Sequence, residues 1–533
     1  MKKLLTCLMI LIAAVTVCAK NPQAKTSCGI IEGREVSGIK VFKGIPFAQP
    51  PTGELRWRAP QPVKAWTGVR KAYEYGPNPM QQPVFGDMNF GTKTMSEDCL
   101  YLNVWTPAKT MDEKLPVLIY FNGGGLIAGS GSEPRYAGMS MARKGIITVT
   151  ANYREGIFGF FAHPELSAET GYKGSGNYGF LDQVAAVRWV KENIAAFGGD
   201  PARITVAGES AGSMSVSALM ASPLCKELFA RAIGSSGSIL RNAKLPSLKE
   251  AERKGQEKAE ALGCKSLKEL RDMPAEELMN KAAEAGLPGY NIDGYFLTEQ
   301  PADTYAAGRQ CKVPLLVGGN SYEMPASFIL QGKPATVENA LAGLKAAFGN
   351  DAGKVLQLYG ITTDADVAGS AGIQLASDMF IGFSTWKWGH MHAKTGGSPV
   401  YRYNYCHPRP AMRIKGKTAG LAGGVIDSKD GAAEEPAAPG AVHSADIEYA
   451  MGTLPTNRVY DWQPEDFVMS DVFSGYYANF IKTGNPNGLG LTEWLPINGN
   501  GAAMTLRLDI DSEMLDDVKT EQRYEALDGL MTE

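Results

Sequence analysis

The feature that most constrains the fold of this chain is a serine set between a short apolar strand and a helix. Ile204–Ala207 is typical of a buried strand, and Ala211–Met220 is typical of a helix that follows at once. The junction, Gly208-Glu209-Ser210-Ala211-Gly212, matches the pattern G-x-S-x-G. In this context the turn is sharp, and it would hold Ser210 with a strained backbone and its hydroxyl at the carboxyl edge of a sheet. A chance match is the alternative in a Gly-rich chain, but the flanking strand and helix disfavour it.

The rest of the chain alternates β-rich apolar runs with helical patterns, which is typical of βα units around a mainly parallel sheet. Further strands are expected at Val117–Phe121, Ile146–Ala151, Val313–Val317 and Val400–Tyr405. A helix is expected over Phe180–Ala196, where apolar residues recur at helical spacing. We therefore expect an α/β fold with a large, mainly parallel central sheet, helices on both faces, and helical or loop insertions around the active site.

Two segments stand apart from this alternation. Lys244–Leu287 is charged, Ala-rich and helical, so we expect a side insertion that contributes to the rim of the site. Gly416–Gly440 has the composition of a loop. No internal repeat or free linker is evident, and we interpret residues 20–533 as one elaborated domain, although length alone would suggest two or more.

The N-terminus has the organisation of a secretory signal peptide. A positive start, Met1-Lys2-Lys3, precedes the apolar run Leu4–Val17, and small residues favour cleavage after Ala19. The run falls short of the ~20 residues that a membrane span needs, and no later segment is long and apolar enough. We expect residues 1–19 to be removed and the protein to be exported, periplasmic or secreted. Lipidation at Cys18 is the less favoured alternative, because Val17 is bulky for that signal.

Composition disfavours several kinds of partner. The formal net charge is −3, and no run of Lys and Arg interleaved with aromatic residues suggests a nucleic-acid surface. Beyond the signal, six cysteines lie far apart and form no metal-ligand pattern. We therefore expect no nucleic-acid partner and no metal, and composition leaves the oligomeric state open.

A glycine triplet supplies candidate oxyanion donors. Stabilising a tetrahedral oxyanion needs at least two backbone N–H groups aimed at one oxygen. Ala211, directly after Ser210, can supply one. The run Gly123-Gly124-Gly125 follows a predicted strand and can supply the others, because glycine lets the backbone approach a substrate closely. Alone, such a triplet is more often a flexible turn.

A serine nucleophile needs a base, and the chain has five histidines: His163, His390, His392, His407 and His443. In the α/β-hydrolase pattern the chain order is Ser, acid, His, which excludes His163. His390 and His392 lie two residues apart in an aromatic segment, so on a helix they would face different sides. We interpret both as packing or surface residues.

Two histidines remain as candidates for the base. His407 follows a predicted strand and is the weaker one, whereas His443 ends a loop that could place it over Ser210. The acid should lie between Ser210 and His443 in the chain. Glu323 follows the strand ending near Val317, at the carboxyl edge where such sites form. A surface carboxylate remains the alternative for Glu323 on spacing alone.

Taken together, these residues resemble the carboxylesterase type B family, which includes the cholinesterases and para-nitrobenzyl esterase-like proteins. Phe197–Gly212 resembles the family's serine signature along its whole length, and Glu97–Trp105 resembles its second signature. Supporting similarity occurs at Phe42–Ala48, Asn177–Gln183 and Gly484–Pro486. The resemblance extends from about Gly29 to Pro496.

The resemblance implies a serine hydrolase of carboxylic esters that forms an acyl-enzyme with a small-molecule ester and needs no cofactor. It implies Ser210 as nucleophile, Glu323 as acid and His443 as base. The implied oxyanion donors are Gly124, Gly125 and Ala211. The family motif around the base matches Gly440–Asp446, which favours His443 over His407.

The chain departs from the family pattern at its cysteines. In the family, the cysteine of the second signature pairs with an upstream cysteine, but the matching position here is Met80. Cys264 likewise lacks a partner near Glu269. We therefore expect Cys99 and Cys264 to be free.

Other departures concern the site. Many members have His before the glycine triplet, where this chain has Asn122. Cholinesterases place a Trp before the second signature, but Asp87–Phe90 has none, so we do not expect choline ester specificity. Position suggests an apolar substrate pocket whose wall includes Leu126, Ile127, Met214, Phe380, Phe383 and Trp386, although each is more often simply core.

Two alternatives remain open at the level of sequence. Some members of the family are catalytically inactive binding or adhesion proteins, but those lack a triad member, and here all three positions are filled. The same triad also serves amidases, lactonases and thioesterases, which the sequence separates poorly from esterases.

Overall fold

The computed structural model describes residues 21–241, 243–286, 288–414, 416–427, 438–497 and 503–531. The signal peptide predicted for residues 1–19 lies outside these ranges, as does Cys18.

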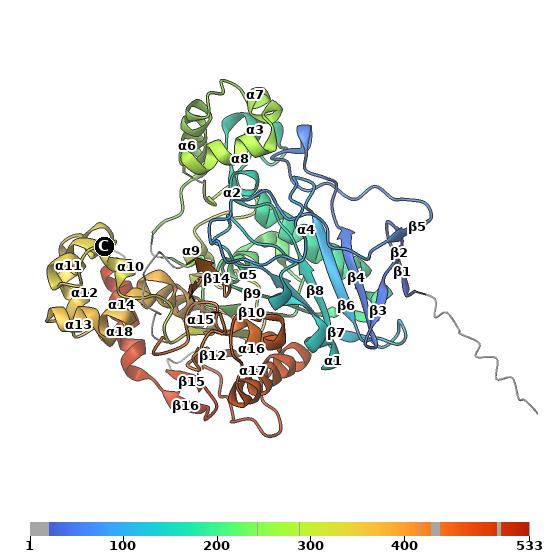
Figure 1. Cartoon of the computed structure of the whole chain (residues 1–533). Helices are drawn as coiled ribbons and strands as arrows, with labels where there is room; N and C mark the ends of the chain where they lie inside the picture. Colours follow the sequence, from blue (N-terminus) through green and yellow to red (C-terminus); the bar gives the residue numbers. More distant parts are fainter. Residues whose placement is uncertain are drawn as a thin grey trace, which may run out of the picture.

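An eleven-stranded sheet forms the centre of the described chain (Figure 1). Its strands, in spatial order, are β16 (Glu513–Asp516), β15 (Met504–Leu508), β12 (Val400–Tyr405), β11 (Leu315–Asn320), β10 (Arg231–Ser235), β9 (Gly199–Glu209), β7 (Leu115–Phe121), β8 (Ile147–Ala151), β6 (Tyr101–Thr106), β4 (Ile39–Pro46) and β3 (Arg34–Val36). The strands from β15 to β8 pair in parallel, and the outer strands pair antiparallel. The predicted α/β fold with a mainly parallel sheet is confirmed.

Helices cover both faces of this sheet (Figure 1). Near the sheet lie α1 (Met139–Arg143), α2 (Gly156–Phe160), α4 (Tyr178–Asn193), α5 (Ala211–Ala221), α9 (Pro301–Ala306), α15 (Phe383–Thr395), α16 (Ile447–Met451) and α17 (Pro464–Thr483). The short helix α3 (Pro164–Glu169) lies farther from the sheet, at the top of Figure 1. A helical group that includes the C-terminus comprises α10 (Ser327–Leu330), α11 (Val337–Phe348), α12 (Ala352–Leu358), α13 (Asp364–Ala368), α14 (Ser370–Ser377) and α18 (Val518–Met531). A small sheet is formed by β1 (Gln23–Thr26), β2 (Gly29–Glu32) and β5 (Val69–Lys71).

The central strands are buried on both faces, as expected for a parallel sheet covered by helices. Along β7, Val117 and Ile119 belong to one core cluster, together with Val184 of α4. Leu118 and Tyr120 belong to a second core cluster, together with residues of α16 and α17. Successive side chains of β7 therefore pack into cores on opposite faces of the sheet. Polar functional side chains are accordingly expected at the ends of the strands.

The predicted strands are confirmed within one or two residues at most ends. The strand expected at Ile204–Ala207 is longer and begins at Gly199. The helix expected over Phe180–Ala196 is α4, followed by a 3₁₀ turn over Ile194–Phe197. The loop expected over Gly416–Gly440 contains a short hairpin in its described part, formed by β13 (Lys417–Ala419) and β14 (Val425–Asp427).

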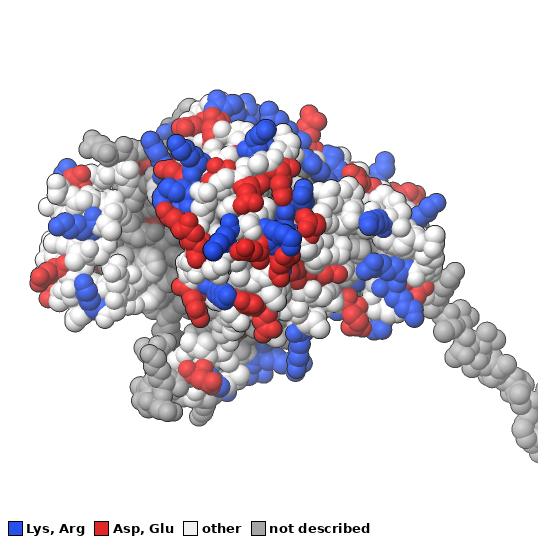
Figure 2. All heavy atoms as spheres, turned by 90° about the horizontal axis from the view of Figure 1, so that it is seen from above, with Lys and Arg blue, Asp and Glu red and all other residues white. Residues whose placement is uncertain are grey.

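The charged insertion is helical, as predicted, and forms α6 (Leu248–Ala261), α7 (Leu267–Asp272) and α8 (Ala275–Glu284) at one end of the molecule. Figure 2 shows this end with basic and acidic side chains interspersed. Arg56 holds the insertion by donating to the carbonyls of Leu270 and Met273 at 2.9 and 2.8 Å.

The six cysteines of the described ranges are free, as expected for Cys99 and Cys264. Met80, at the position of the missing family cysteine, lies with Cys99 in the wall of one small cavity. None of the helices in the described part of the chain combines the length and the apolar character that a bilayer crossing requires.

Candidate active site

Ser210 lies at a tight turn between β9 and α5. Its backbone has φ 55° and ψ −121°, a conformation that is strained for a residue with a side chain. A Cβ on Gly208 would lie 2.4 Å from the carbonyl carbon of Gly212, and a Cβ on Gly212 would lie 2.2 Å from the carbonyl oxygen of Phe121. Only glycine permits this close approach, which makes the G-x-S-x-G spacing a steric requirement.

A continuous hydrogen-bonded chain connects Ser210 with a histidine and a carboxylate. His443 Nε2 lies 3.0 Å from Ser210 Oγ, and His443 Nδ1 lies 2.6 Å from Glu323 Oε2. Because a carboxylate can only accept, Nδ1–H donates to Glu323, which leaves Nε2 free to accept the hydroxyl proton. Both His443 and Glu323 are buried.

The acid and the base are aligned by their own backbones. Glu323 follows β11, and His443 precedes α16. Tyr322 N–H donates to the Ala441 carbonyl at 2.9 Å, which pairs the two segments beside the functional side chains.

Glu323 is further held by two donors. Its Oε1 accepts the hydroxyl of Ser236 at 2.5 Å and the backbone N–H of Asn320 at 2.7 Å. Neither residue was singled out from the sequence, because a serine after one strand and an asparagine ending another carry no distinctive pattern.

The other histidines lie elsewhere. His407, the alternative base, contacts Asp466 at 2.9 Å and Asp509 at 3.4 Å. His390 and His392 face different sides of α15, where His390 contacts Glu521 and His392 Nε2 contacts the Val313 carbonyl at 2.8 Å. Both of these histidines therefore contact groups outside the chain of residues that joins Ser210, His443 and Glu323.

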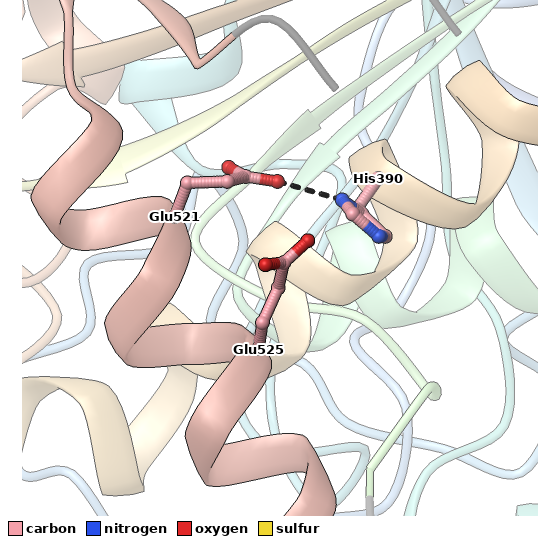
Figure 3. A group of neighbouring side chains, drawn as sticks. All are labelled: His390, Glu521 and Glu525. Carbon is pink, nitrogen blue, oxygen red and sulfur yellow. Dashed lines mark hydrogen bonds and ion pairs between the residues drawn. The ribbon is translucent and has the colours of Figure 1, made fainter. Parts of the chain in front are cut away.

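Figure 3 shows the group formed by His390, Glu521 and Glu525, whose potential ligand atoms lie within 4.8 Å of one another. Glu521 already accepts from Arg402 Nη1 at 2.8 Å and from Trp386 Nε1 at 2.9 Å. The pKa of Glu521 is lowered to about 2, because these donors and His390 outweigh its burial. An arginine that shares the carboxylate competes with a metal cation, so this group is best explained as an ion-pair anchor between α15 and α18.

The glycine triplet lies beside the nucleophile. A Cβ on Gly123 would lie 3.1 Å from Ser210 Cβ, and Gly124 and Gly125 line the same cavity as Ser210. Gly124 has φ 110° and Gly125 has φ 68°, a region that residues with a side chain rarely adopt. Ala211 begins α5, so its N–H lies at the positive end of the helix.

Asn122 braces this loop in place of the family histidine. Its Nδ2 donates to the Gly123 carbonyl at 3.0 Å and to Glu155 Oε1 at 3.2 Å. Tyr153 O–H donates to the Asn122 carbonyl at 3.0 Å. Burial raises the pKa of Glu155 well above its ordinary value, which favours the uncharged form of this side chain.

Glu209 is a second carboxylate at the base. Its Oε1 lies 3.3 Å from His443 Nε2. Burial raises the pKa of Glu209. Burial alone would lower the pKa of His443, but the carboxylates of Glu209 and Glu323 outweigh it and raise that pKa above its ordinary value.

A cavity of about 160 Å³ opens over Ser210. Its lining is mostly apolar: Phe85, Met88, Tyr136, Met214, Phe380, Ile381, Leu421 and Ala422. Met214 lies where the sequence predicted a pocket wall. Among the described residues, the lining includes no part of α6, α7 or α8, so the expected contribution of that insertion to the rim is not seen in the cavity itself.

Phe380, also predicted as pocket wall, lines the cavity, whereas Leu126, Ile127, Phe383 and Trp386 lie outside its lining. Leu126 is buried in the main core, and its carbonyl accepts from Gly156 N–H at 2.8 Å. Phe383 packs against Trp386 and Tyr524, with ring centroids 5.6 and 6.0 Å apart. A π-helical turn over Asp378–Gly382 separates Phe380 from the face that Phe383 presents.

Comparison with known proteins identifies relatives of this chain. The carboxylesterase family model matches residues 20–527. Fumonisin B1 esterase of Sphingopyxis macrogoltabida is 39% identical over 74% of this chain and 73% of its own length. A medium-chain fatty acyl-CoA hydrolase precursor of Anas platyrhynchos is 32% identical over 89% and 87%. The crystal structure of carboxylesterase EST55 of Geobacillus stearothermophilus superposes with a TM-score of 0.78 at 30% identity, covering 94% of this chain and 99% of that one.

The chain therefore belongs to the carboxylesterase family and is a serine carboxylic ester hydrolase.

Replacing Asn122 tests the brace on the glycine loop. In Asn122→Ala we expect kcat for a neutral ester to fall about 10- to 100-fold with little change in KM. The substitution would leave the backbone N–H groups of the glycine loop less well positioned, and these groups stabilise the oxyanion mainly in the transition state. Steady-state kinetics, with a thermal melt to verify folding, measures this. The exposed Asn350→Ala is the matched control, and an unchanged kcat in folded Asn122→Ala would contradict the role.

Replacing Glu209 tests its effect on the base. A neutral His443 is required for activity, so kcat/KM falls as pH drops through the pKa of that histidine. Glu209→Gln removes a charge that favours protonated His443. We therefore expect the acid limb of the pH profile to move to lower pH, by at least about one unit. The exposed Glu257→Gln serves as control, and a limb that stays in place would count against the coupling.

Proposed function

We propose that Ser210, His443 and Glu323 act as a catalytic triad that hydrolyses small-molecule carboxylic esters through an acyl-enzyme. The observation that carries this proposal is the unbroken chain of contacts, 3.0 Å from Ser210 to His443 and 2.6 Å from His443 to Glu323. Glu323 orients the imidazole and stabilises its protonated form.

In acylation, Ser210 Oγ attacks the ester carbonyl carbon while its proton passes to His443 Nε2. The carbonyl oxygen becomes an oxyanion that accepts from the backbone N–H groups of Gly124, Gly125 and Ala211. The bond to the alcohol oxygen then breaks, and His443 gives its proton to the departing alkoxide. An alcohol leaves, and Ser210 carries the acyl group.

In deacylation, water attacks the acyl carbon and gives a proton to His443. The same donors hold the second oxyanion. The bond between the acyl carbon and Ser210 Oγ breaks, His443 returns the proton to Ser210, and the carboxylic acid leaves. The chain's own side chains and backbone, together with water, supply every proton transfer.

Thioester hydrolysis is the second candidate. The Anas platyrhynchos relative is named as an acyl-CoA hydrolase, and the same triad can expel a thiolate. Oxygen esters are favoured because the other relatives above are named as esterases.

We also propose that residues 20–533 form the mature catalytic domain and that residues 1–19 direct its export to the periplasm or medium. The positive start and apolar run support export. Mass spectrometry of the protein expressed with its full N-terminus in a bacterial host tests this. A mature chain beginning at Lys20 is expected, whereas a lipidated N-terminal Cys18 or an uncleaved chain would contradict it.

The central experiment is turnover of short-chain p-nitrophenyl esters, with fumonisin B1 and an acyl thioester in the same panel. Ser210→Ala should lower kcat by at least about 10⁴-fold, and a fluorophosphonate should label the wild type but not the variant. Ser370→Ala, an exposed serine on α14, should match the wild type. A folded protein with neither turnover nor labelling would favour the binding-protein alternative.

A further inference from the structure

Four side chains around the catalytic cavity can carry charge: Arg135, Glu209, Arg241 and His443. Three of these side chains already contact an oppositely charged group. Arg135 is buried and pairs with Glu133 at 2.9 Å, and Glu209 and His443 lie 3.3 Å apart.

Arg241 differs from these three. It is exposed and lies a few residues beyond β10. Its side chain contacts Met214 through Nη2, which lies 3.6 Å from Met214 Sδ. Within the described ranges, Arg241 forms no ion pair with any carboxylate.

The contact with Met214 sets Arg241 close to the chemistry. Met214 is on α5, one helical turn after Ser210, and its N–H donates to the Ser210 carbonyl at 2.9 Å. The cavity lining that Arg241 shares with Met214 is mostly apolar. A guanidinium at the edge of such a wall is a preformed partner for a carboxylate, since its N–H fork matches both oxygens.

The other charges of the cavity do not oppose an anion. Arg135 adds positive potential, although Glu133 balances it. Glu209 Oε1 lies 3.3 Å from His443 Nε2, so the negative charge of this carboxylate is directed at the base. A substrate carboxylate at Arg241 therefore meets no negative charge in the cavity lining that lacks a positive partner of its own.

We propose that Arg241 makes this site selective for esters that carry a free carboxylate in addition to the scissile ester, such as half-esters of dicarboxylic acids. The inference rests on the proposed function, because it assigns a substrate class to that same site. Arg241 binds the remote carboxylate and acts as a specificity residue, while the proton transfers stay with Ser210 and His443.

The test compares matched esters that differ in charge. Monoethyl adipate and ethyl hexanoate differ by a terminal carboxylate against a methyl group, and 3-acetoxypropanoate carries the carboxylate on the alcohol half. Release of the alcohol or acid is followed by chromatography at low ionic strength. The quantity measured is the ratio of kcat/KM for each anionic ester to that for the neutral ester.

We expect Arg241→Gln to lower this ratio about 10- to 100-fold for at least one anionic ester, mainly through KM. Arg241→Lys should retain part of the preference, and added salt should reduce the preference of the wild type. Hydrolysis of ethyl hexanoate should change less than hydrolysis of the anionic ester in both variants. Arg253→Gln, an exposed arginine on α6, is the matched control and should leave the ratio unchanged.

Equal ratios in the wild type and Arg241→Gln, with ethyl hexanoate still hydrolysed, would overturn the assignment of Arg241 and leave the esterase proposal intact. Failure of the wild type to hydrolyse any of the three esters, or to react with a fluorophosphonate, would instead overturn the proposed function. The two failures are therefore distinguishable in one set of measurements.

Discussion

The close approach of β9 and α5 at the nucleophile turn is the constraint on which the rest of the site depends. Gly208 and Gly212 nearly touch, and the Phe121 carbonyl at the end of β7 lies against them. Ser210 could not hold φ 55° by its own preference. Packing from three sides imposes it, including the hydrogen bond from Ser210 N–H to the Ser235 carbonyl at 2.8 Å. The same junction brings the glycine loop beside the serine, so one contact fixes both nucleophile and oxyanion donors.

The remaining functional groups come from distant parts of the chain and meet because the sheet is parallel. The loops after β7, β9 and β11 leave the sheet at the same edge, and a backbone pairing at Tyr322 brings in the segment of His443. Because these groups are buried, water screens their charges weakly and the interactions between them are strong. His443 lies between Glu323 and Glu209, whose carboxylates favour its protonated form. That arrangement stabilises the imidazolium formed during each proton transfer.

Short-range sequence patterns predicted much of the fold and much of the candidate active site. The strand, turn and helix around Ser210 are confirmed, as is the parallel sheet. The turn was predictable because the spacing of Gly208 and Gly212 around Ser210 follows from the steric requirements of a tight turn. Chain order and local composition left both His407 and His443 as candidates for the base, and only the resemblance to the family motif over Gly440–Asp446 favoured His443. The sequence placed Phe380 and Phe383 together in the pocket wall, and it could not predict the π-helical turn that separates the faces of these two residues. Arg241 was missed because a lone arginine in a loop has no pattern.

The most direct test of the account is to trap the covalent intermediate. Rapid acid quenching during turnover of p-nitrophenyl acetate, followed by peptide mapping with mass spectrometry, locates any acetyl group transferred to the protein. The account predicts an acetyl ester on the hydroxyl of Ser210 that appears within the first turnover and disappears when substrate is exhausted. An acetyl group on a different residue, or steady turnover with no acetylated peptide under conditions where deacylation is slow, would contradict it.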